Sequence, residues 1–147
     1  MELTPKVIRD AESFNAFRSL LQSSKLPVDD LNFLNHLLIG FYDGTEPVAT
    51  GGLEIHGDYA LLRSLSVKIG IRGQSLGSSI TDHLIEEAKK RNLKAIYLLT
   101  ETAHVFFLRK GFKDTDRNSV PLEVKSSTEF SNVCGPTAIC MFYDLKK

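Results

Sequence analysis

The chain has 147 residues, of which 42% are hydrophobic and 24% are charged, so it can bury one core but is too short for two ordinary domains. Basic and acidic residues both number 18 and form no basic block, which argues against nucleic acid or an anionic membrane as a partner. The N-terminus is charged, and no apolar run approaches the roughly 20 residues that cross a bilayer. The sequence therefore predicts one cytoplasmic globular domain over residues 1–147.

The first half of the chain predicts one amphipathic helix followed by a series of strands. A short strand begins at Val7 and Ile8, and Asp10 can cap a helix that Pro27 ends. Four apolar residues of this helix fall on one face: Phe14, Phe17, Leu20 and Leu21. A second short helix is predicted at Asp29–Leu34. Turn signals at Asp43-Gly44 and His56-Gly57-Asp58 then separate apolar runs that predict strands: Leu37–Tyr42, Val48–Ile55 and Tyr59–Val67.

The second half of the chain predicts a strand–helix–strand crossover followed by shorter elements. A helix at Ser75–Arg91, which stops at Asn92, places four apolar residues on one stripe: Leu76, Ile80, Leu84 and Ala88. The apolar run Ala95–Leu99 predicts a strand parallel to the one before this helix. The remaining segments are predicted in this order: a helix at Ala103–Lys110 ending at Gly111, a strand opening at Phe112, an irregular polar segment at Asn118–Ser131 and a last strand at Ala138–Tyr143.

Glycines mark the turn between the strand Tyr59–Val67 and the helix behind it: Gly70, Gly73 and Gly77. Backbone N–H groups exposed at such a turn, together with the positive dipole end of the helix, can hold a diphosphate. The spacing fits neither Gly-x-Gly-x-x-Gly nor a loop ending in Gly-Lys-Ser/Thr. The turn therefore predicts either a site for a nucleotide-bearing ligand or a simple connection between the two elements.

Two segments resemble signatures of the GNAT N-acetyltransferase superfamily: Arg72-Gly-Gln-Ser-Leu-Gly77 and Ala103-His-Val-Phe-Phe-Leu-Arg-Lys-Gly-Phe112. The order of the predicted elements, an antiparallel meander followed by one crossover, resembles that family too. The resemblance implies an α/β (α+β) fold with a mixed, twisted sheet of about seven strands and about four flanking helices. Such a sheet is mostly antiparallel with a parallel central pair.

The same resemblance implies acetyl-CoA as the co-substrate and no metal. The amides of Arg72 through Ser78 would wrap its pyrophosphate, and backbone groups of Leu65 and Val67 would pair with the pantetheine arm as an added strand does. Ser75 occupies the first glycine position of the family's motif. The cofactor-binding residues implied in this way are Leu65, Ser66, Val67, Arg72, Gly73, Gln74, Ser75, Leu76, Gly77 and Ser78.

Acetyl transfer to an amine needs a donor for the thioester oxygen, a base for the amine and a proton for the departing thiolate. The resemblance assigns the first role to the backbone N–H of Val67, whereas Phe107 and Leu61 stand where relatives carry a tyrosine acid and a glutamate base. Glu54 and His56 alternate onto one face of the preceding strand. They are therefore either candidate bases or solvent-facing residues at a strand end.

Arg63 is a charged residue inside an apolar strand. Alternation puts it on the strand face of Leu65 and Val67, where its guanidinium suits a substrate carboxylate. The alternative is an internal ion pair with one of three acidic residues: Glu54, Asp58 or Glu101.

Leu98–Phe112 and the Val-Pro pair at 120–121 are similar to acetyltransferase domains of N-acetylglutamate synthases. Residues 130–141 lack the arginine with which those domains hold glutamate, and the chain is closer to a short stand-alone subgroup associated with arsenic resistance. Cys134 and Cys140 offer soft thiol ligands, yet they match no zinc spacing, and Cys140 also suits a protein core.

The sequence therefore predicts an acetyl-CoA-dependent N-acetyltransferase that acts on a small-molecule amine, with an amino acid or amino-acid analogue as one acceptor class. One alternative is a non-catalytic acyl-CoA-binding or sensor module, suggested by Phe107, Leu61 and Ser75. Another is an interaction domain on the same scaffold. A homodimer is compatible with the sequence, which does not specify one.

Overall fold

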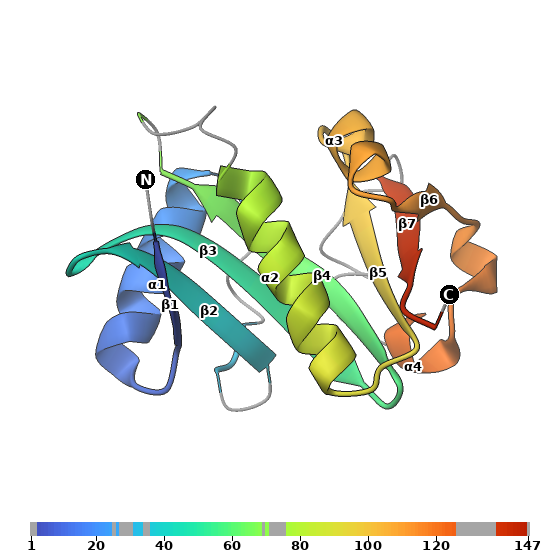
Figure 1. Ribbon diagram of the computed structural model, residues 1–147, viewed down its shortest axis with the longest axis horizontal. Coiled ribbons are helices and arrows are strands. Elements are labelled where there is room, and N and C mark those ends of the chain that lie inside the picture. The colour runs from blue at the N-terminus through green and yellow to red at the C-terminus, as the bar shows by residue number, and fades with distance from the viewer. Residues whose placement is uncertain are drawn as a thin grey trace. The chain divides into compact units, whose positions relative to one another are not determined.

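The computed structural model describes residues 3–24, 26, 31–33, 36–68, 70, 76–125 and 138–146. Within these ranges the strands form one seven-stranded sheet in the order β1-β2-β3-β4-β5-β7-β6 (Figure 1). The strands are β1 Thr4–Val7, β2 His36–Asp43, β3 Glu46–His56, β4 Tyr59–Val67, β5 Ala95–Thr100, β6 Lys113–Asp114 and β7 Ile139–Asp144. The helices are α1 Ala11–Ser23, α2 Leu76–Lys90, α3 His104–Arg109 and α4 Leu122–Lys125.

Strands β4 and β5 run parallel, while β1 pairs with β2, β2 with β3, β5 with β7 and β6 with β7 in antiparallel registers. The predicted fold class, a mostly antiparallel mixed sheet with a parallel pair and four helices, is thereby confirmed for the described residues. Contacts divide the chain into two compact units, Met1–Glu54 with Arg63–Leu84 and Ile55–Leu62 with Ile85–Lys147. No helix in the described ranges has both the length and the apolar character that crossing a membrane requires.

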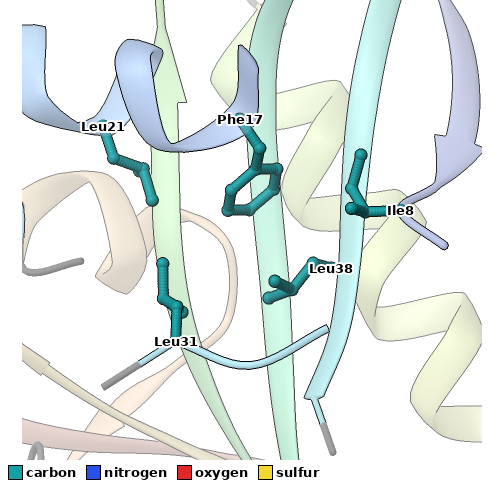
Figure 2. Packing of buried hydrophobic residues seen from close by; sticks show 5 residues of the cluster. All are labelled: Ile8, Phe17, Leu21, Leu31 and Leu38. Carbon is teal, nitrogen blue, oxygen red and sulfur yellow. The ribbon is translucent and has the colours of Figure 1, made fainter. Parts of the chain in front are cut away.

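The first unit has a hydrophobic core between α1 and the sheet. The Asp10 carboxylate accepts the backbone N–H of Ser13 at 2.8 Å, which confirms the predicted cap. The helix then buries Phe17 and Leu21 completely against apolar residues of the first unit, as Figure 2 shows: Ile8, Leu31 and Leu38. Phe14 packs at the edge of this cluster, and Leu20 is half-buried.

Helix α2 covers the opposite face of the same strands. A Cβ atom at Gly51 would lie 3.0 Å from both Ile80 and Leu84 of α2, whereas a Cβ at Gly52 would meet Leu38 of the core below α1. Because successive residues of a strand point to opposite faces, α1 and α2 lie on opposite faces of β3 (Figure 1). The predicted stripe of α2 is buried throughout: Leu76, Ile80, Leu84 and Ala88.

The second unit is held by the β5–β7 ladder and by a small core next to it. The parallel register joins Tyr59, Ala60 and Leu61 of β4 to Ala95, Ile96 and Tyr97 of β5. Leu61 packs with apolar residues from the C-terminal part of the chain: Val120, Val124 and Cys140. Helix α3 ends before Gly111, whose φ of +98° suits glycine and confirms the predicted stop.

Two predicted segments differ from the structure. The segment predicted as irregular contains a 3₁₀ turn at Arg117–Ser119, capped by Asp116, and the single-turn helix α4. The carbonyl of Pro121 accepts the N–H groups of Val124 and Lys125, so proline starts this turn as it starts many helices. Of the predicted helix at residues 29–34, the described part, Leu31–Phe33, is not helical. Pro27 and the rest of that segment lie outside the described residues, as do 126–131.

We expect the Cys140 thiol to be unreactive in the folded protein. Cys140 is 3% exposed, and burial raises the pKa of its thiol to about 11, so little thiolate forms at pH 8. In a Cys134→Ser variant, which leaves one of the chain's two cysteines, Ellman's reagent should label the native protein slowly and the guanidinium-unfolded protein at once. Rapid labelling at pH 8 without denaturant would contradict this burial.

Candidate functional site

Strand β4 continues from Tyr59 to Val67, but its regular geometry is interrupted at Ser64. Its φ is +62°, a left-handed conformation that non-glycine residues seldom adopt in a strand. The Ser64 carbonyl accepts the hydroxyl of Thr50 on β3 at 2.7 Å, which fixes this backbone turn. The interruption lies three residues beyond Leu61, the last β4 residue in the parallel register with β5.

This interruption changes which side chains share a face. Simple alternation predicts that Arg63 faces the same way as Leu65 and Val67. Instead, Arg63 reaches Glu54 on the α1 side of the sheet, and the hydroxyl of Ser66 hydrogen-bonds to that of Ser24 at the end of α1. The predicted common face of Arg63, Leu65 and Val67 was therefore wrong, because the left-handed residue breaks the twofold period.

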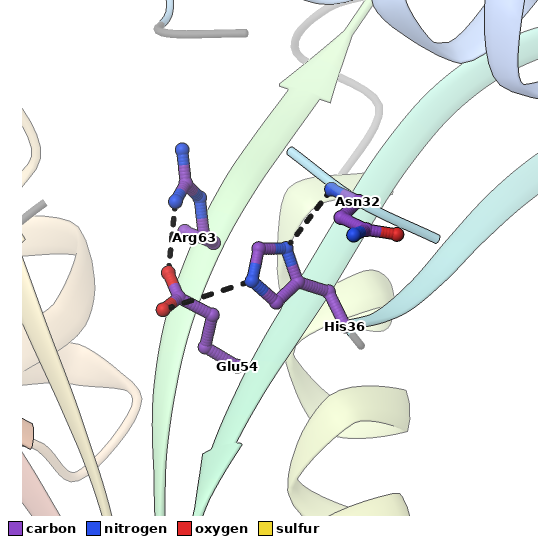
Figure 3. Close-up of polar contacts among 4 residues, drawn as sticks. All are labelled: Asn32, His36, Glu54 and Arg63. Carbon is purple, nitrogen blue, oxygen red and sulfur yellow. Dashed lines mark hydrogen bonds and ion pairs between the residues drawn. The ribbon is translucent and has the colours of Figure 1, made fainter. Parts of the chain in front are cut away.

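Glu54 and Arg63 form a buried ion pair (Figure 3). Arg63 Nη1 donates to Glu54 Oε2 at 2.8 Å, and the two side chains are 1% and 5% exposed. The other carboxylate oxygen, Oε1, lies 3.8 Å from His36 Nε2 on the neighbouring strand β2, where His36 pairs directly with Glu54 in the register. A carboxylate is thus held between a guanidinium and an imidazole.

The loop before β2 fixes the orientation of the His36 ring. The backbone N–H of Asn32 donates to His36 Nδ1 at 3.3 Å, and the His36 N–H donates to the Asn32 carbonyl at 2.9 Å. Because Nδ1 accepts a hydrogen bond, the neutral imidazole carries its proton on Nε2, the nitrogen that faces Glu54. The ring can therefore present an N–H to the carboxylate without being charged.

These contacts identify the ion-pair partner of Arg63 and the surroundings of Glu54. The ion-pair partner of Arg63 is Glu54. Asp58, another of the three candidates, instead pairs with Lys94, with 3.5 Å between Asp58 Oδ2 and Lys94 Nζ. Glu54 is 4% exposed, so the interpretation of it as a solvent-facing residue was wrong. His56, two residues further along β3, is half-buried. The sequence reasoning missed His36, whose only signal was a polar residue at the start of an apolar strand.

The structure describes only some of the predicted cofactor-binding residues. Residues 72–75 lie outside it, whereas Leu76, Gly77 and Ser78 form the first turn of α2. The first N–H groups of a helix have no partners within the helix, and no acidic side chain stands in this turn to repel an anion. The fit to a diphosphate is therefore good at the described end of the turn.

A cavity of about 490 Å³ opens beside the end of β4. Its lining includes Ser19 and Leu20 of α1, Pro47 of β3, and Lys68. Lys68 immediately follows Val67, and its ammonium pairs with Glu46 at 2.6 Å. This volume is within the range of small-ligand sites, and Lys68 connects the cavity to the end of β4.

Phe107 and Leu61, at the two positions where an acid and a base were expected from the resemblance, are core residues. Phe107 is 5% exposed, with its ring centroid 5.0 Å from that of Phe106 and 5.4 Å from that of Phe112. Leu61 is fully buried. Neither side chain can donate or accept a proton. Among the described residues, no group of three or more His, Cys, Asp or Glu side chains is arranged to hold a metal ion. Cys134 lies outside those residues.

The chain matches the Acetyltransferase (GNAT) family over residues 8–112. Among solved structures, N-acetylglutamate synthase from Neisseria gonorrhoeae, complexed with coenzyme A and L-arginine, has a TM-score of 0.79 at 12% identity, over 99% of this chain and 34% of that chain. Rv2747 from Mycobacterium tuberculosis, in complex with CoA, has a TM-score of 0.74 at 20% identity, over 95% of this chain and 98% of that chain. The ribosomal-protein alanine N-acetyltransferase from Escherichia coli has a TM-score of 0.70 at 17% identity, over 97% of this chain and 94% of that chain. The chain spans about a third of the length of the synthase, and at these identities the structures establish a common fold.

We expect Arg63→Met to destabilise the protein by about 3 kcal/mol, because it leaves the Glu54 charge buried without its cation. The double variant Arg63→Met, Glu54→Leu should recover most of this loss, since it removes both charges. Lys68→Met is the matched control, because it breaks an exposed pair and should cost less than about 1 kcal/mol. Urea unfolding measures all three, and equal losses for Arg63→Met and Lys68→Met would contradict the burial of the pair.

Proposed function

Because this chain belongs to the acetyltransferase (GNAT) family, we propose that it transfers the acetyl group of acetyl-CoA to the amine of a small molecule. The observation that carries this proposal is the family match from residue 8 to residue 112, which includes β4, α2 and β5. An amino acid or amino-acid analogue is the proposed acceptor class. The proposal includes a cytoplasmic location and a single acetyltransferase domain over the whole chain.

The described residues suit the donor side of this reaction. The first turn of α2, at Leu76, Gly77 and Ser78, would hold one end of the diphosphate, and Arg72, Gly73, Gln74 and Ser75 would complete the site. Backbone groups of Leu65, Ser66 and Val67 would hold the pantetheine arm as an added strand. Acetyl-CoA supplies the activated acyl group, so the protein has to position it, orient the acceptor and move protons.

The chemical step forms a bond between the amine nitrogen and the acetyl carbon and breaks the bond between that carbon and sulfur. The amine loses a proton to a base, and the departing thiolate gains one. We assign the base to Glu54, whose carboxylate is held by Arg63 and faced by His36, so that its orientation is fixed before the acceptor arrives. His56, half-buried at the end of β3, is the second candidate.

Arg63 also has a proposed role in binding the acceptor. A guanidinium presents five N–H donors in a planar fork, so it can hold Glu54 through Nη1 and meet a substrate carboxylate through another edge. The Arg63 side chain is 1% exposed, so such a carboxylate would have to enter the protein to reach it. This favours a small acceptor over a side chain on the surface of another protein.

A second candidate function is a non-catalytic acyl-CoA-binding or sensor module. It is favoured by Phe107 and Leu61, which are packed in the core where many family members carry an acid and a base. The two functions differ in turnover and not in cofactor binding. In the catalytic function, the CoA thiolate would take its proton from solvent, because residue 107 is not a tyrosine.

The test combines calorimetry with an assay for CoA release. We expect acetyl-CoA to bind, and we expect free thiol to appear when amines that also carry a carboxylate are offered, more than with matched amines that lack it. Binding without thiol release across amino acids, polyamines, aminoglycosides and arsenical amino-acid analogues would favour the sensor module. Absence of binding would reject both functions.

We expect Glu54→Gln to lower kcat by about 100-fold, because the amide keeps the shape of the side chain but cannot take up a proton. Glu54→Asp retains a carboxylate and should lose less activity. Glu86→Gln, on the exposed face of α2, is the matched control and should behave as wild type. Unchanged acetyl-CoA affinity and circular dichroism establish that the variants are folded. A Glu54→Gln variant with wild-type kcat would remove Glu54 as the base.

A further inference from the structure

Ser64 is unusual in both its backbone and its side chain. Its φ of +62° makes it one of two non-glycine residues with positive φ in the described chain, the other being Asn92 at the end of α2. The residue is 8% exposed, and within the described ranges no group forms a hydrogen bond with its hydroxyl. Ser64 therefore combines a left-handed backbone with a buried, unsatisfied donor.

Both features are unfavourable in the ligand-free protein. A Cβ atom disfavours the left-handed region, where glycine is the residue of lowest cost. A buried hydroxyl without a partner loses its hydrogen bonds to water and gains none in return. Glycine at this position would avoid both penalties. A residue that breaks two local rules at once points to a role that is fulfilled only when something else is bound.

The backbone around Ser64 is held in place by contacts of its carbonyl and of nearby residues. Thr50 Oγ1 donates to the Ser64 carbonyl, and Arg63, the preceding residue, is held by Glu54. Ser66, two residues further on, is tied to Ser24. With the Ser64 carbonyl, Arg63 and Ser66 engaged, the hydroxyl is the group of Ser64 left to meet a ligand.

The order of residues along the chain indicates which part of the ligand this is. The proposed diphosphate site lies at the start of α2, C-terminal to Val67. A pantetheine arm that runs from there along Val67 and Leu65 arrives next at Ser64 with its thioester end. The thioester oxygen then lies beyond the Val67 N–H, the donor that the resemblance to the family implies. We infer that the Ser64 hydroxyl donates a hydrogen bond to the carbonyl oxygen of the acetyl thioester, so that it distinguishes acetyl-CoA from CoA. This inference rests on the proposed function.

Ser64→Gly tests the inference because it should move stability and binding in opposite directions. It removes the backbone strain and the unsatisfied hydroxyl, so we expect the melting temperature of the ligand-free protein to rise by about 3 °C. It also removes the contact with the acetyl group, so the dissociation constant for acetyl-CoA, measured by calorimetry, should rise about fivefold. The dissociation constant for CoA, which has no acetyl oxygen, should stay unchanged.

Two further variants exclude simpler explanations. Ser64→Ala keeps the Cβ atom and lacks the hydroxyl, so it should lose the same acetyl-CoA affinity without the full gain in melting temperature. Asn92→Gly relaxes the other left-handed residue, at φ +58°, and should leave both dissociation constants unchanged.

The inference is wrong if Ser64→Gly and Ser64→Ala bind acetyl-CoA as wild type does, or if they lose affinity for CoA to the same extent. Failure of the wild-type protein to bind acetyl-CoA would instead reject the proposed function. The melting temperature is measured without ligand, so it reports on the strain at Ser64 in either case.

Discussion

The polar core of the first unit depends on the buried pair of Glu54 and Arg63, because two charges removed from water must satisfy each other. The pair joins β3 to β4, and His36 extends it to β2, so three strands of the first unit contribute to one polar network inside an apolar core. Such a network stabilises little by itself, since desolvation offsets most of the Coulomb attraction. Its consequence is geometric: it holds one carboxylate in one orientation.

That geometry depends on the irregular backbone at Ser64. A regular β4 would send Arg63 and Ser66 to opposite faces, since they are three residues apart. The left-handed residue between them puts Arg63 against Glu54 and Ser66 against Ser24, both on the side of α1. The hydrogen bond from Thr50 holds this turn in place. The strain at Ser64 and the position of the charged pair are therefore two aspects of one feature of β4.

Much of the fold follows from local patterns that the sequence displays directly. The stripe Leu76, Ile80, Leu84 and Ala88 required a helix over the sheet, and Asp10 fixed the start of α1 through its own side chain. These signals involve residues within a few positions of one another, so no long-range contact is needed to interpret them. The helix at α4 was missed because one turn after Pro121 has no apolar period to display. For the same reason the family motifs, which are also local, could be recognised from residue types alone.

The polar site could not be predicted in this way, because it depends on two departures from regular pairing. Next to the turn, Asp43 pairs with Glu46 and Tyr42 with Pro47, and extending that register would place His36 opposite Leu53, whose side chain faces away from Glu54. A bulge between Phe41 and Tyr42 shifts the register by one residue, and only this shift brings His36 to Glu54. The second departure, at Ser64, brings Arg63 to the same carboxylate from the other side. No glycine or proline stands at Ser64, and Pro47 beside the bulge does not by itself specify the register, so both irregularities are decided by packing across the sheet. His36, Glu54 and Arg63 come together only because the twofold alternation of the strands is broken at these two places. Strict alternation would place these three side chains on different faces of the sheet.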